Sequence, residues 1–348
     1  MGYSGAEYPF INDIMGNSYK ERYAKIWSDA TKLDIHAEMH NEFTFFSANL
    51  EHFLPLVPLA EHESLFKQSV AYHRMGALDL TFGAAGYIPP LVGWDVQWLD
   101  KLRTQPGIIA SAHTGTHLLI AVLMAKASIP FVLLAAGHLI NRLKRIWKDI
   151  IRAFPGSSLP RVVDASSPWA LRQLIEHAQA GTNVLVYWDG QQGAVGLDQP
   201  GKRVSVPFLG QHLLLRRGIA FVAHTAGAPI YPLVCFRQRD QSVACFHRSA
   251  VPACNTTVDR FADYALQAIS AHFASLLIHF PAQWYNWTQL QHQVSPDRYT
   301  MESGRELSSG YGILKGQAGF FLFDKKNYHT MALADDHLAC LESHIANG

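Results

Sequence analysis

The sequence predicts an α/β protein built on a mixed, largely parallel sheet flanked by helices. Short apolar runs that suit buried strands alternate with helical segments between residues 106 and 279, a rhythm typical of parallel sheets. Apolar residues make up 49% of the 348 residues, which is enough for a sizeable core, and no internal repeat is present. We therefore expect one α/β domain over 95–294, a helical region over 1–94 packed on it, and an appendage over 295–348.

Each element is expected from its local pattern. Residues 12–100 read as helical and aromatic-rich, and Pro89 and Pro90 close that stretch. Strands are expected at the short apolar runs 106–112, 130–136, 161–165, 182–189, 228–237 and 241–248. Helices are expected after His113 and over 139–153, 168–181, 216–226 and 257–279.

The tail has a different composition from the rest of the chain. Residues 295–312 are polar and read as a linker, and 316–333 read as two strands around an Asp-Lys-Lys-Asn turn, followed by a short helix. We expect this appendage to contact a substrate or partner rather than to complete the core.

Charge and cysteine content exclude several classes of protein. The 29 basic and 28 acidic residues give a formal charge of +1, so nucleic acid is not an expected partner. Four widely spaced cysteines suit a reducing compartment and form no CxxC metal site. The N-terminus does not resemble a secretory signal, and Lys126 and Pro130 interrupt the apolar stretch 118–136. We expect a cytoplasmic protein that is not transmembrane and is at most weakly peripheral.

The most informative segment contains His113. A buried strand is expected to end there, with a helix beginning at Thr114 or Gly115. This places an imidazole at the carboxyl end of a strand, where open α/β sheets hold their sites. The N–H groups of the helix start, at Thr114 and Gly115, are expected to bind the substrate carbonyl and a developing oxyanion.

A second polar residue follows another buried strand. Asp189 stands at the end of 182–189, before a glycine-rich turn that contains Gln191 and Gln192. An aspartate before glycine is often only a turn residue. Farther along the chain, a Val-Pro-Phe-Leu-Gly segment contains Phe208, and an arginine pair follows it.

Five segments together resemble the LpxL/HtrB-type acyltransferases of lipid A biosynthesis, within the lysophospholipid acyltransferase superfamily, over residues 95–292. They are the strand ending at His113, then Asp189 with Gln191 or Gln192 and Gly193, then Val206–Gly210, then Ala226-Gly227-Ala228 with Pro232, and finally Pro281-Ala282-Gln283-Trp284-Tyr285-Asn286-Trp287. The resemblance implies a glycerolipid-acyltransferase-like fold and an acyl thioester donor, either acyl carrier protein or CoA. It also implies a hydroxyl or amine acceptor, with Gln191, Gln192 and Phe208 near the substrate. No bound cofactor is implied beyond the phosphopantetheine-linked or CoA thioester of the donor.

The chain departs from the family motif at one position. The family pattern is a histidine, four residues and then an acid, but Leu118 occupies the acid's place here. In the family, that acid orients the histidine and supports the imidazolium. We expect Asp189 to supply the carboxylate if its strand neighbours that of His113, and His117, one helical turn from His113, to assist it.

The departure narrows the predicted function. An amine acceptor needs less help from a base than a hydroxyl does. We therefore expect transfer of an acyl or aminoacyl group onto a small soluble or peptide acceptor, as in specialised metabolism. His113 is expected to act as the general base. The segment 137–154 places Arg142, Lys144, Arg145 and Lys148 where an acyl or peptidyl carrier protein could dock. A solvated helix face explains these basic residues equally well.

Two other functions remain open from the sequence. One is a metal-dependent hydrolase that uses His113 and His117, with Cys245 and His247 as further ligands, although HxxxH without the glutamate of HExxH is a weak signal. The other is a non-catalytic protein that binds acyl chains or a carrier on the same fold. GxSxG, P-loop and GxGxxG motifs are absent from the sequence.

Overall fold

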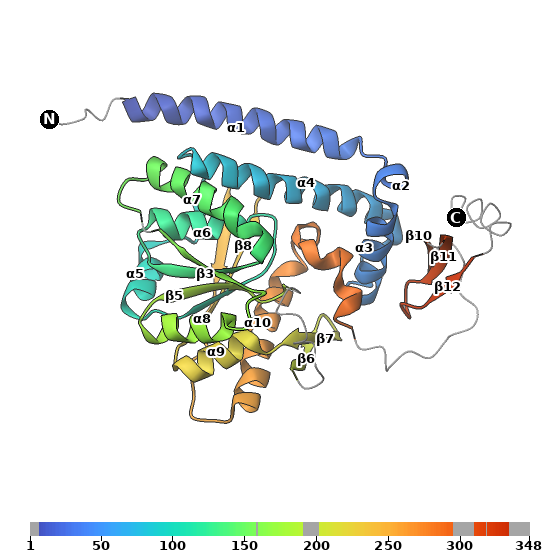
Figure 1. Ribbon diagram of the computed structural model, residues 1–348. Helices are drawn as coiled ribbons and strands as arrows, with labels where there is room; N and C mark the ends of the chain where they lie inside the picture. Colours follow the sequence, from blue (N-terminus) through green and yellow to red (C-terminus); the bar gives the residue numbers. More distant parts are fainter. Residues whose placement is uncertain (1–6, 158, 191–201, 295–309, 318, 334–348) are drawn as a thin grey trace.

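The structure, a computed structural model, describes residues 7–157, 159–190, 202–294, 310–317 and 319–333 (Figure 1). Its centre is a sheet of seven strands: β1 (Leu91–Val92), β2 (Ile108–Ser111), β3 (Phe131–Ala135), β4 (Arg161–Asp164), β5 (Asn183–Tyr187), β8 (Ile230–Arg237) and β9 (Val243–His247). The strand order is β1-β9-β8-β2-β5-β3-β4, and only β8 and β9 pair antiparallel. The mixed, largely parallel α/β sheet predicted from the sequence is confirmed.

The register of the two central strands determines where the polar residues lie. Strands β2 and β5 are parallel neighbours, and Ser111 pairs with Tyr187 at their carboxyl ends. His113 and Asp189 each stand two residues beyond that pair. The sheet therefore delivers both side chains to the same edge, side by side.

Helices cover both faces of the sheet because its strands are apolar on both sides. Ile109 and Leu185 face one core, with α5 (Val96–Thr104), α6 (His117–Lys126) and α7 (Ile140–Ala153) packed over it. Ile108 and Val184 face the opposite core, which is covered by α8 (Ala170–Gln179), α9 (Gly218–Ala226) and α10 (Val258–Leu277). Neighbouring strand residues point to opposite faces, as the two-residue period of a strand requires.

The N-terminal region adds two long helices above α6 and α7. Helix α4 (Leu59–Ala84) packs on α6, and α1 (Glu7–Thr31) runs along the outer side of α4 (Figure 1). Glycines permit the close approach of α4: a β-carbon at Gly83 would lie 3.0 Å from Val122 Cγ1, and one at Gly76 would lie 2.9 Å from the carbonyl oxygen of Gly115. Helix α4 thus reaches the turn that follows His113.

Shorter elements surround the site edge of the sheet. The hairpin β6 (Arg203–Phe208) and β7 (Gln211–Arg216) packs against α10, with Leu209 and Gly210 at positive φ in its turn. A series of 3-10 turns, η2 (Pro281–Gln283), η3 (Tyr285–Thr288) and η4 (Leu290–His292), follows α10, and η1 (Gly137–Leu139) precedes α7. The hairpin was not predicted from the sequence; its first strand coincides with the Val-Pro-Phe segment.

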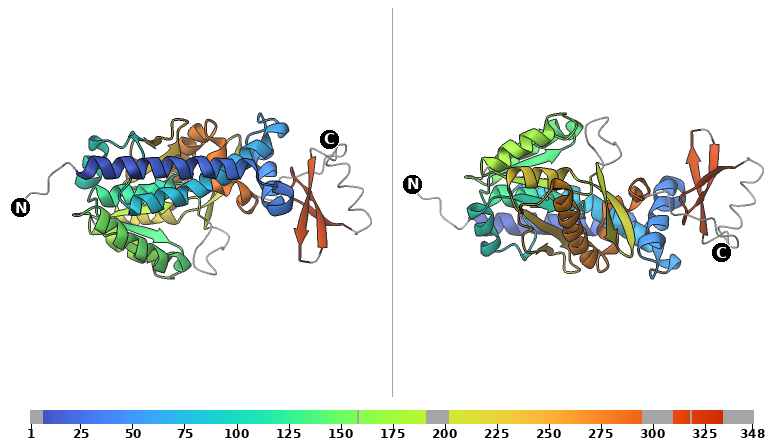
Figure 2. Two further views of the ribbon diagram at one scale, coloured as in Figure 1. Left: turned by 90° about the horizontal axis from the view of Figure 1, so that it is seen from above. Right: turned by 90° about the horizontal axis from the view of Figure 1, so that it is seen from below.

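The tail forms a separate small sheet beside α3. Strands β10 (Tyr311–Gly316), β11 (Gly319–Asp324) and β12 (Thr330–Ala332) pack against α3 (His40–Phe53), which α2 (Ile35–Glu38) precedes, at one end of the molecule (Figure 2). The Asp324–Asn327 turn joins β11 to β12 as expected, but the described part of the tail has three strands rather than two, and the first begins within the expected linker. The expected terminal helix lies outside the described residues.

The apolar stretch 118–136 forms most of α6, a turn and β3, as its lysine and proline predict. None of the described helices has the length and apolar character needed to cross a bilayer.

Candidate active site

The site is organised around a direct contact between His113 and Asp189. The ring Nδ1 of His113 lies 2.7 Å from Asp189 Oδ1, and the backbone N–H of His113 donates to Oδ2 of the same carboxylate at 2.9 Å. The Asp189 side chain is fully buried, whereas that of His113 is 31% exposed. The carboxylate is therefore enclosed while the imidazole retains access to solvent.

Side chains from the segment after α10 hold Asp189 in place. Trp284 donates its indole N–H to Asp189 Oδ2 at 2.7 Å, and Asn286 donates to the backbone carbonyl of Asp189 at 2.6 Å. Trp284 is fully buried among aromatic rings that include Phe273 and Trp287. The carboxylate thus accepts from three N–H donors, each fixed by the surrounding fold.

The contact shifts the pKa values of both groups in opposite directions. Burial acts to lower the pKa of His113, but the charge and hydrogen bond of Asp189 outweigh it and raise that pKa above its ordinary value. Burial acts to raise the pKa of Asp189, and the nearby imidazolium with the hydrogen bonds it accepts lowers that pKa below its ordinary range. The carboxylate stays ionised and supports a proton on His113.

This geometry leaves one ring nitrogen for chemistry. The ionised carboxylate can only accept, so Nδ1 of His113 carries a hydrogen and, in the neutral ring, Nε2 holds the free lone pair. Gly190 lies against the ring: a β-carbon there would be 3.4 Å from His113 Cε1. A buried aspartate, an oriented imidazole and a free Nε2 together form an acid–base pair of the kind used in nucleophilic group transfer.

A comparison with protein-family models gives no match, and a comparison with curated proteins gives none either. One solved structure that the chain matches is a 1-acyl-sn-glycerophosphate (LPA) acyltransferase, PlsC, from Thermotoga maritima. The TM-score is 0.36 and the sequence identity 13%, over 70% of this chain and 97% of that one. A similarity this low carries no inference about activity. No comparison places the chain among the LpxL/HtrB-type enzymes, so that resemblance rests on the motifs alone.

His117 lies beside His113 but has a different environment. Its ring centroid is 5.1 Å from that of His113, and its Nδ1–H donates to the Thr114 carbonyl at 2.6 Å. Burial, with the neighbouring His113 charge, lowers the pKa of His117 to about 3. His117 is therefore a neutral ring that packs against His113, while Leu118, in the place of the family acid, packs against the apolar core.

The expected substrate contacts of Thr114 and Gly115 differ in the structure. Helix α6 begins at His117 rather than at Thr114 or Gly115. The N–H of Gly115 donates to the Gln283 carbonyl, the N–H of Thr114 donates to the Ala112 carbonyl, and the Thr114 hydroxyl donates to the Cys235 carbonyl. These donors are already used inside the protein, and binding of a substrate carbonyl by Thr114 and Gly115 stays a prediction.

The other expected substrate contacts fall in three places. Phe208 is buried in the core between Trp284, Phe273 and Phe53, and its contact with a substrate stays a prediction. Gln191 and Gln192 lie outside the described residues. Arg142 and Arg145 are exposed on α7, whose chain leaves β3 at the same edge of the sheet as His113.

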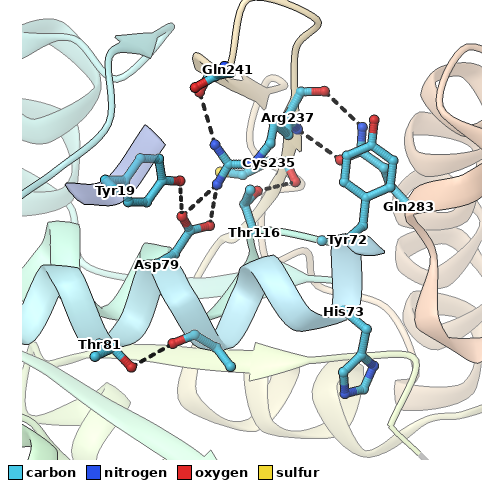
Figure 3. A network of polar contacts seen from close by, with 12 residues as sticks. Tyr19, Tyr72, His73, Asp79, Thr81, Thr116, Cys235, Arg237, Gln241 and Gln283 are labelled. Atoms are coloured by element: carbon cyan, nitrogen blue, oxygen red, sulfur yellow. Dashed lines mark hydrogen bonds and ion pairs between the residues drawn. The ribbon is translucent and has the colours of Figure 1, made fainter. Parts of the chain in front are cut away.

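Gln283 connects the His113 turn to a buried ion pair. Its side-chain amide accepts from the Arg237 N–H and donates to the Arg237 carbonyl, both at 2.8 Å (Figure 3). Arg237 in turn donates to both carboxylate oxygens of Asp79 on α4, at 2.5 and 2.6 Å, and Tyr19 of α1 donates to the same carboxylate at 2.6 Å (Figure 3). The N-terminal helices are thereby tied to the segment that positions Asp189.

Sequence reasoning did not assign roles to Trp284, Asn286 or Gln283. The Pro-Ala-Gln-Trp-Tyr-Asn-Trp segment resembles a family motif, and its polar side chains among aromatic ones are the sequence signal that indicates a supporting role. The metal alternative names Cys245 and His247 as further ligands. In the structure, Cys245 contacts Cys235, and His247 stacks on Trp98. Within the part of the chain that the structure describes, no group of three or more metal-ligating side chains occurs.

Proposed function

We propose that this protein transfers an acyl or aminoacyl group from a thioester donor to an amine or hydroxyl acceptor, with His113 as the general base. The observation that carries the proposal is the 2.7 Å contact between His113 Nδ1 and the buried carboxylate of Asp189. The order of the family-like motifs along the chain supports acyl transfer over other uses of such a pair.

In the proposed reaction, Nε2 of His113 removes a proton from the acceptor amine or hydroxyl as its nitrogen or oxygen attacks the thioester carbonyl. The carbon–sulfur bond then breaks, and the imidazolium returns its proton to the departing thiolate. Asp189 stabilises the imidazolium that forms between these steps. The carboxylate substitutes for the acid that the family has at the position of Leu118.

The donor is proposed to be a carrier protein with a phosphopantetheine-linked thioester, or CoA, used in the cytoplasm. Four exposed basic residues support the carrier protein: Arg142, Lys144, Arg145 and Lys148 of α7. Strand β3, which leads to α7, stands two strand spacings from β2, about 10 Å. An acidic carrier docked on α7 could therefore extend its arm to His113.

The proposal is tested by measuring the intact mass of the loaded carrier protein, the acyl donor. Carrier protein loaded with different acyl and aminoacyl groups is incubated with the protein and candidate amines, and loss of the group from the carrier is measured. His113→Ala should slow this transfer about 10²–10⁴-fold, whereas His36→Ala, at an exposed position on α2, should not. Transfer at the wild-type rate by His113→Ala would refute the general-base role.

Carrier docking is tested separately from chemistry. Arg142→Glu with Arg145→Glu should raise the KM for the loaded carrier and leave transfer from a small synthetic thioester unchanged. Equal effects on both donors would contradict docking on α7.

A non-catalytic acyl-binding protein is the second candidate. It is favoured by the hydrogen bonds that the N–H groups of Thr114 and Gly115, the expected oxyanion donors, already make to protein carbonyls. Binding of loaded carrier without any loss of its acyl group, across the panel of acceptors, would support this candidate over the enzyme.

A further inference from the structure

A second imidazole, that of His117, lies beside the proposed base and has no role in the proposed reaction. Its Nδ1 lies 2.6 Å from the backbone carbonyl oxygen of Thr114, and a carbonyl can only accept, so Nδ1 carries the hydrogen. Burial, with the charge of His113, lowers the pKa of His117 to about 3, so the ring is neutral near pH 7. Nε2 of His117 therefore holds a lone pair and acts as an acceptor.

The orientation of this ring is fixed by its neighbours. The rings of Tyr187 and Tyr285 both meet the His117 ring edge-on, each with its centroid 5.1 Å away. The Tyr187 hydroxyl also donates to the backbone carbonyl of His117 at 2.8 Å. A rotated ring would lose the hydrogen bond to Thr114 and leave its buried N–H without an acceptor, which is costly. The fold therefore determines the direction of the Nε2 lone pair.

Nε2 of His117 is accessible from the site. Among the described residues, none donates a hydrogen bond to this atom, yet it is not one of the enclosed polar atoms that lack a partner. The residue is 6% exposed, and the neighbouring His113 side chain is 31% exposed. The exposed part of His117 thus includes Nε2 and adjoins the exposed imidazole of His113.

The two imidazoles are spaced so that one small group can bind both. Each ring has its lone pair on Nε2, because Asp189 fixes the tautomer of His113 and Thr114 fixes that of His117. The two ring centroids are 5.1 Å apart. Two acceptors that receive both hydrogens of one nitrogen, at hydrogen-bond distances of about 2.9 Å, are held at a comparable separation of roughly 5 Å.

We propose that His117 determines the class of acceptor and selects a primary amine. One N–H of the amine donates to Nε2 of His113 and the other donates to Nε2 of His117, which leaves the nitrogen lone pair to attack the thioester carbonyl. A hydroxyl or a secondary amine has a single hydrogen. With that hydrogen on His113, such an acceptor leaves the lone pair of His117 without a donor. The selection rests on the proposed function and names the substrate class of the same site.

The hydrogen bond to His117 persists through the reaction. The carbon–nitrogen bond forms as His113 removes one proton from the amine, and the carbon–sulfur bond breaks as that proton passes to the departing thiolate. The amide product keeps the other N–H and its hydrogen bond to His117. His117 neither gains nor loses a proton, so it acts as a specificity-determining residue and not as a second base.

Acceptors of matched size test the selection. Neutral methylamine has two donating hydrogens, whereas dimethylamine and methanol have one each. Transfer to each acceptor from a small synthetic thioester is followed by mass spectrometry of the product. The preference for methylamine is compared between wild-type and variant proteins, which removes the intrinsic differences in nucleophilicity among the three acceptors.

Two substitutions separate the acceptor atom from the rest of the ring. His117→Asn keeps a donor for the Thr114 carbonyl but has no group at the position of Nε2, whereas His117→Gln can place its amide oxygen there. We expect His117→Asn to lower the preference for methylamine over each of the other two acceptors about 10-fold, and His117→Gln to lower it less. His36→Asn, the same substitution at an exposed position on α2, should leave it unchanged. An unchanged preference in His117→Asn would overturn the inference.

A second measurement does not depend on turnover. In ¹⁵N NMR of the full-length, histidine-labelled protein, His117 should show a hydrogen on Nδ1 and none on Nε2, and its Nε2 signal, identified with His117→Asn, should shift when methylamine is added. A hydrogen on Nε2, or no shift, would overturn the inference even if transfer occurs. A shift without transfer from any donor would support amine binding by His117 and refute the proposed function.

Discussion

The carboxylate of Asp189 binds His113 twice, through the ring Nδ1 and through the backbone N–H. One side chain therefore sets both the tautomer of the imidazole and the path of the chain that carries it. A third donor, the Trp284 indole, completes the set around the same carboxylate. Among the described residues, the groups that hydrogen-bond the Asp189 carboxylate are all N–H donors, so the site requires a pure acceptor at this position.

Asp189→Asn is expected to reduce activity as strongly as His113→Ala, about 10²–10⁴-fold. The amide turns an NH₂ group toward donors that need an acceptor, and it removes the charge that raises the His113 pKa. In the pH profile of kcat/KM, the midpoint that reports ionisation of the general base His113 should therefore move to lower pH. An activity close to wild type with an unchanged profile would reduce Asp189 to a turn residue.

Leu118→Glu should not restore activity in the Asp189→Asn background. Leu118 packs against an apolar cluster, and a carboxylate there would be desolvated without a prepared partner. Transfer rates of the double variant and of Asp189→Asn alone provide the check. Recovery to near the wild-type rate would show that the family arrangement is still accessible to this chain.

Acid should destabilise the fold through His117. Its folded pKa of about 3 lies below its ordinary value of 6.5, so the unfolded chain binds the extra proton between those values and stability falls as pH decreases. His113 has the opposite sign: its raised pKa gives stability that is present below pH 6.5 and is lost as pH rises through the folded value. His117→Asn, which keeps a donor for Thr114, should flatten the acid slope by up to about 1.4 kcal/mol per pH unit. Urea unfolding at pH 6.5, 5.5 and 4.5 measures that slope, and an unaltered slope would show that the buried ring takes up its proton while folded.

Removing one member of the Asp79–Arg237 pair should be severely destabilising. Both side chains are completely buried, and Asp79→Ala leaves the guanidinium without its carboxylate and Tyr19 without its acceptor. We expect a loss of about 3–5 kcal/mol in unfolding free energy. Asp79→Leu combined with Arg237→Met should recover part of it. A double variant no more stable than Asp79→Ala would mean that the pair also sets the geometry of α4.

Truncation after Val294 should leave a folded protein with weaker substrate capture. The main sheet makes no strand pairing with β10–β12, but the tail reaches the site region: Tyr328 donates to Asn49, and Asn49 donates to the Trp287 carbonyl. Circular dichroism and the KM for the loaded carrier measure the two expectations. Asn41→Ala, which removes the hydrogen bonds between the Asn41 side chain and the Lys315 backbone, serves as a milder comparison. Insoluble truncated protein would instead make the tail a required part of the fold.

The sequence predicted the parts of the site that follow from strand pattern and not those that depend on long-range packing. His113 and Asp189 could be placed at one edge because each follows a buried apolar run. The start of α6 could not be placed, because Thr114 forms a β-bridge with Trp284, far away in the sequence, and the helix begins only at His117. The supporting roles of Trp284 and Gln283 depend on partners that no local pattern specifies.

His113 and Asp189 are separated by 76 positions and come together only when β2 and β5 pair. In the family motif quoted above, the histidine and the acid stand within six residues and can meet as soon as a short helix forms. During translation, His113 is synthesised well before Asp189. The imidazole of the growing chain therefore lacks its carboxylate partner until β2 and β5 pair. The contact between His113 and Asp189, on which the proposed function depends, would therefore form late in the synthesis of the chain and would be lost whenever those two strands separate.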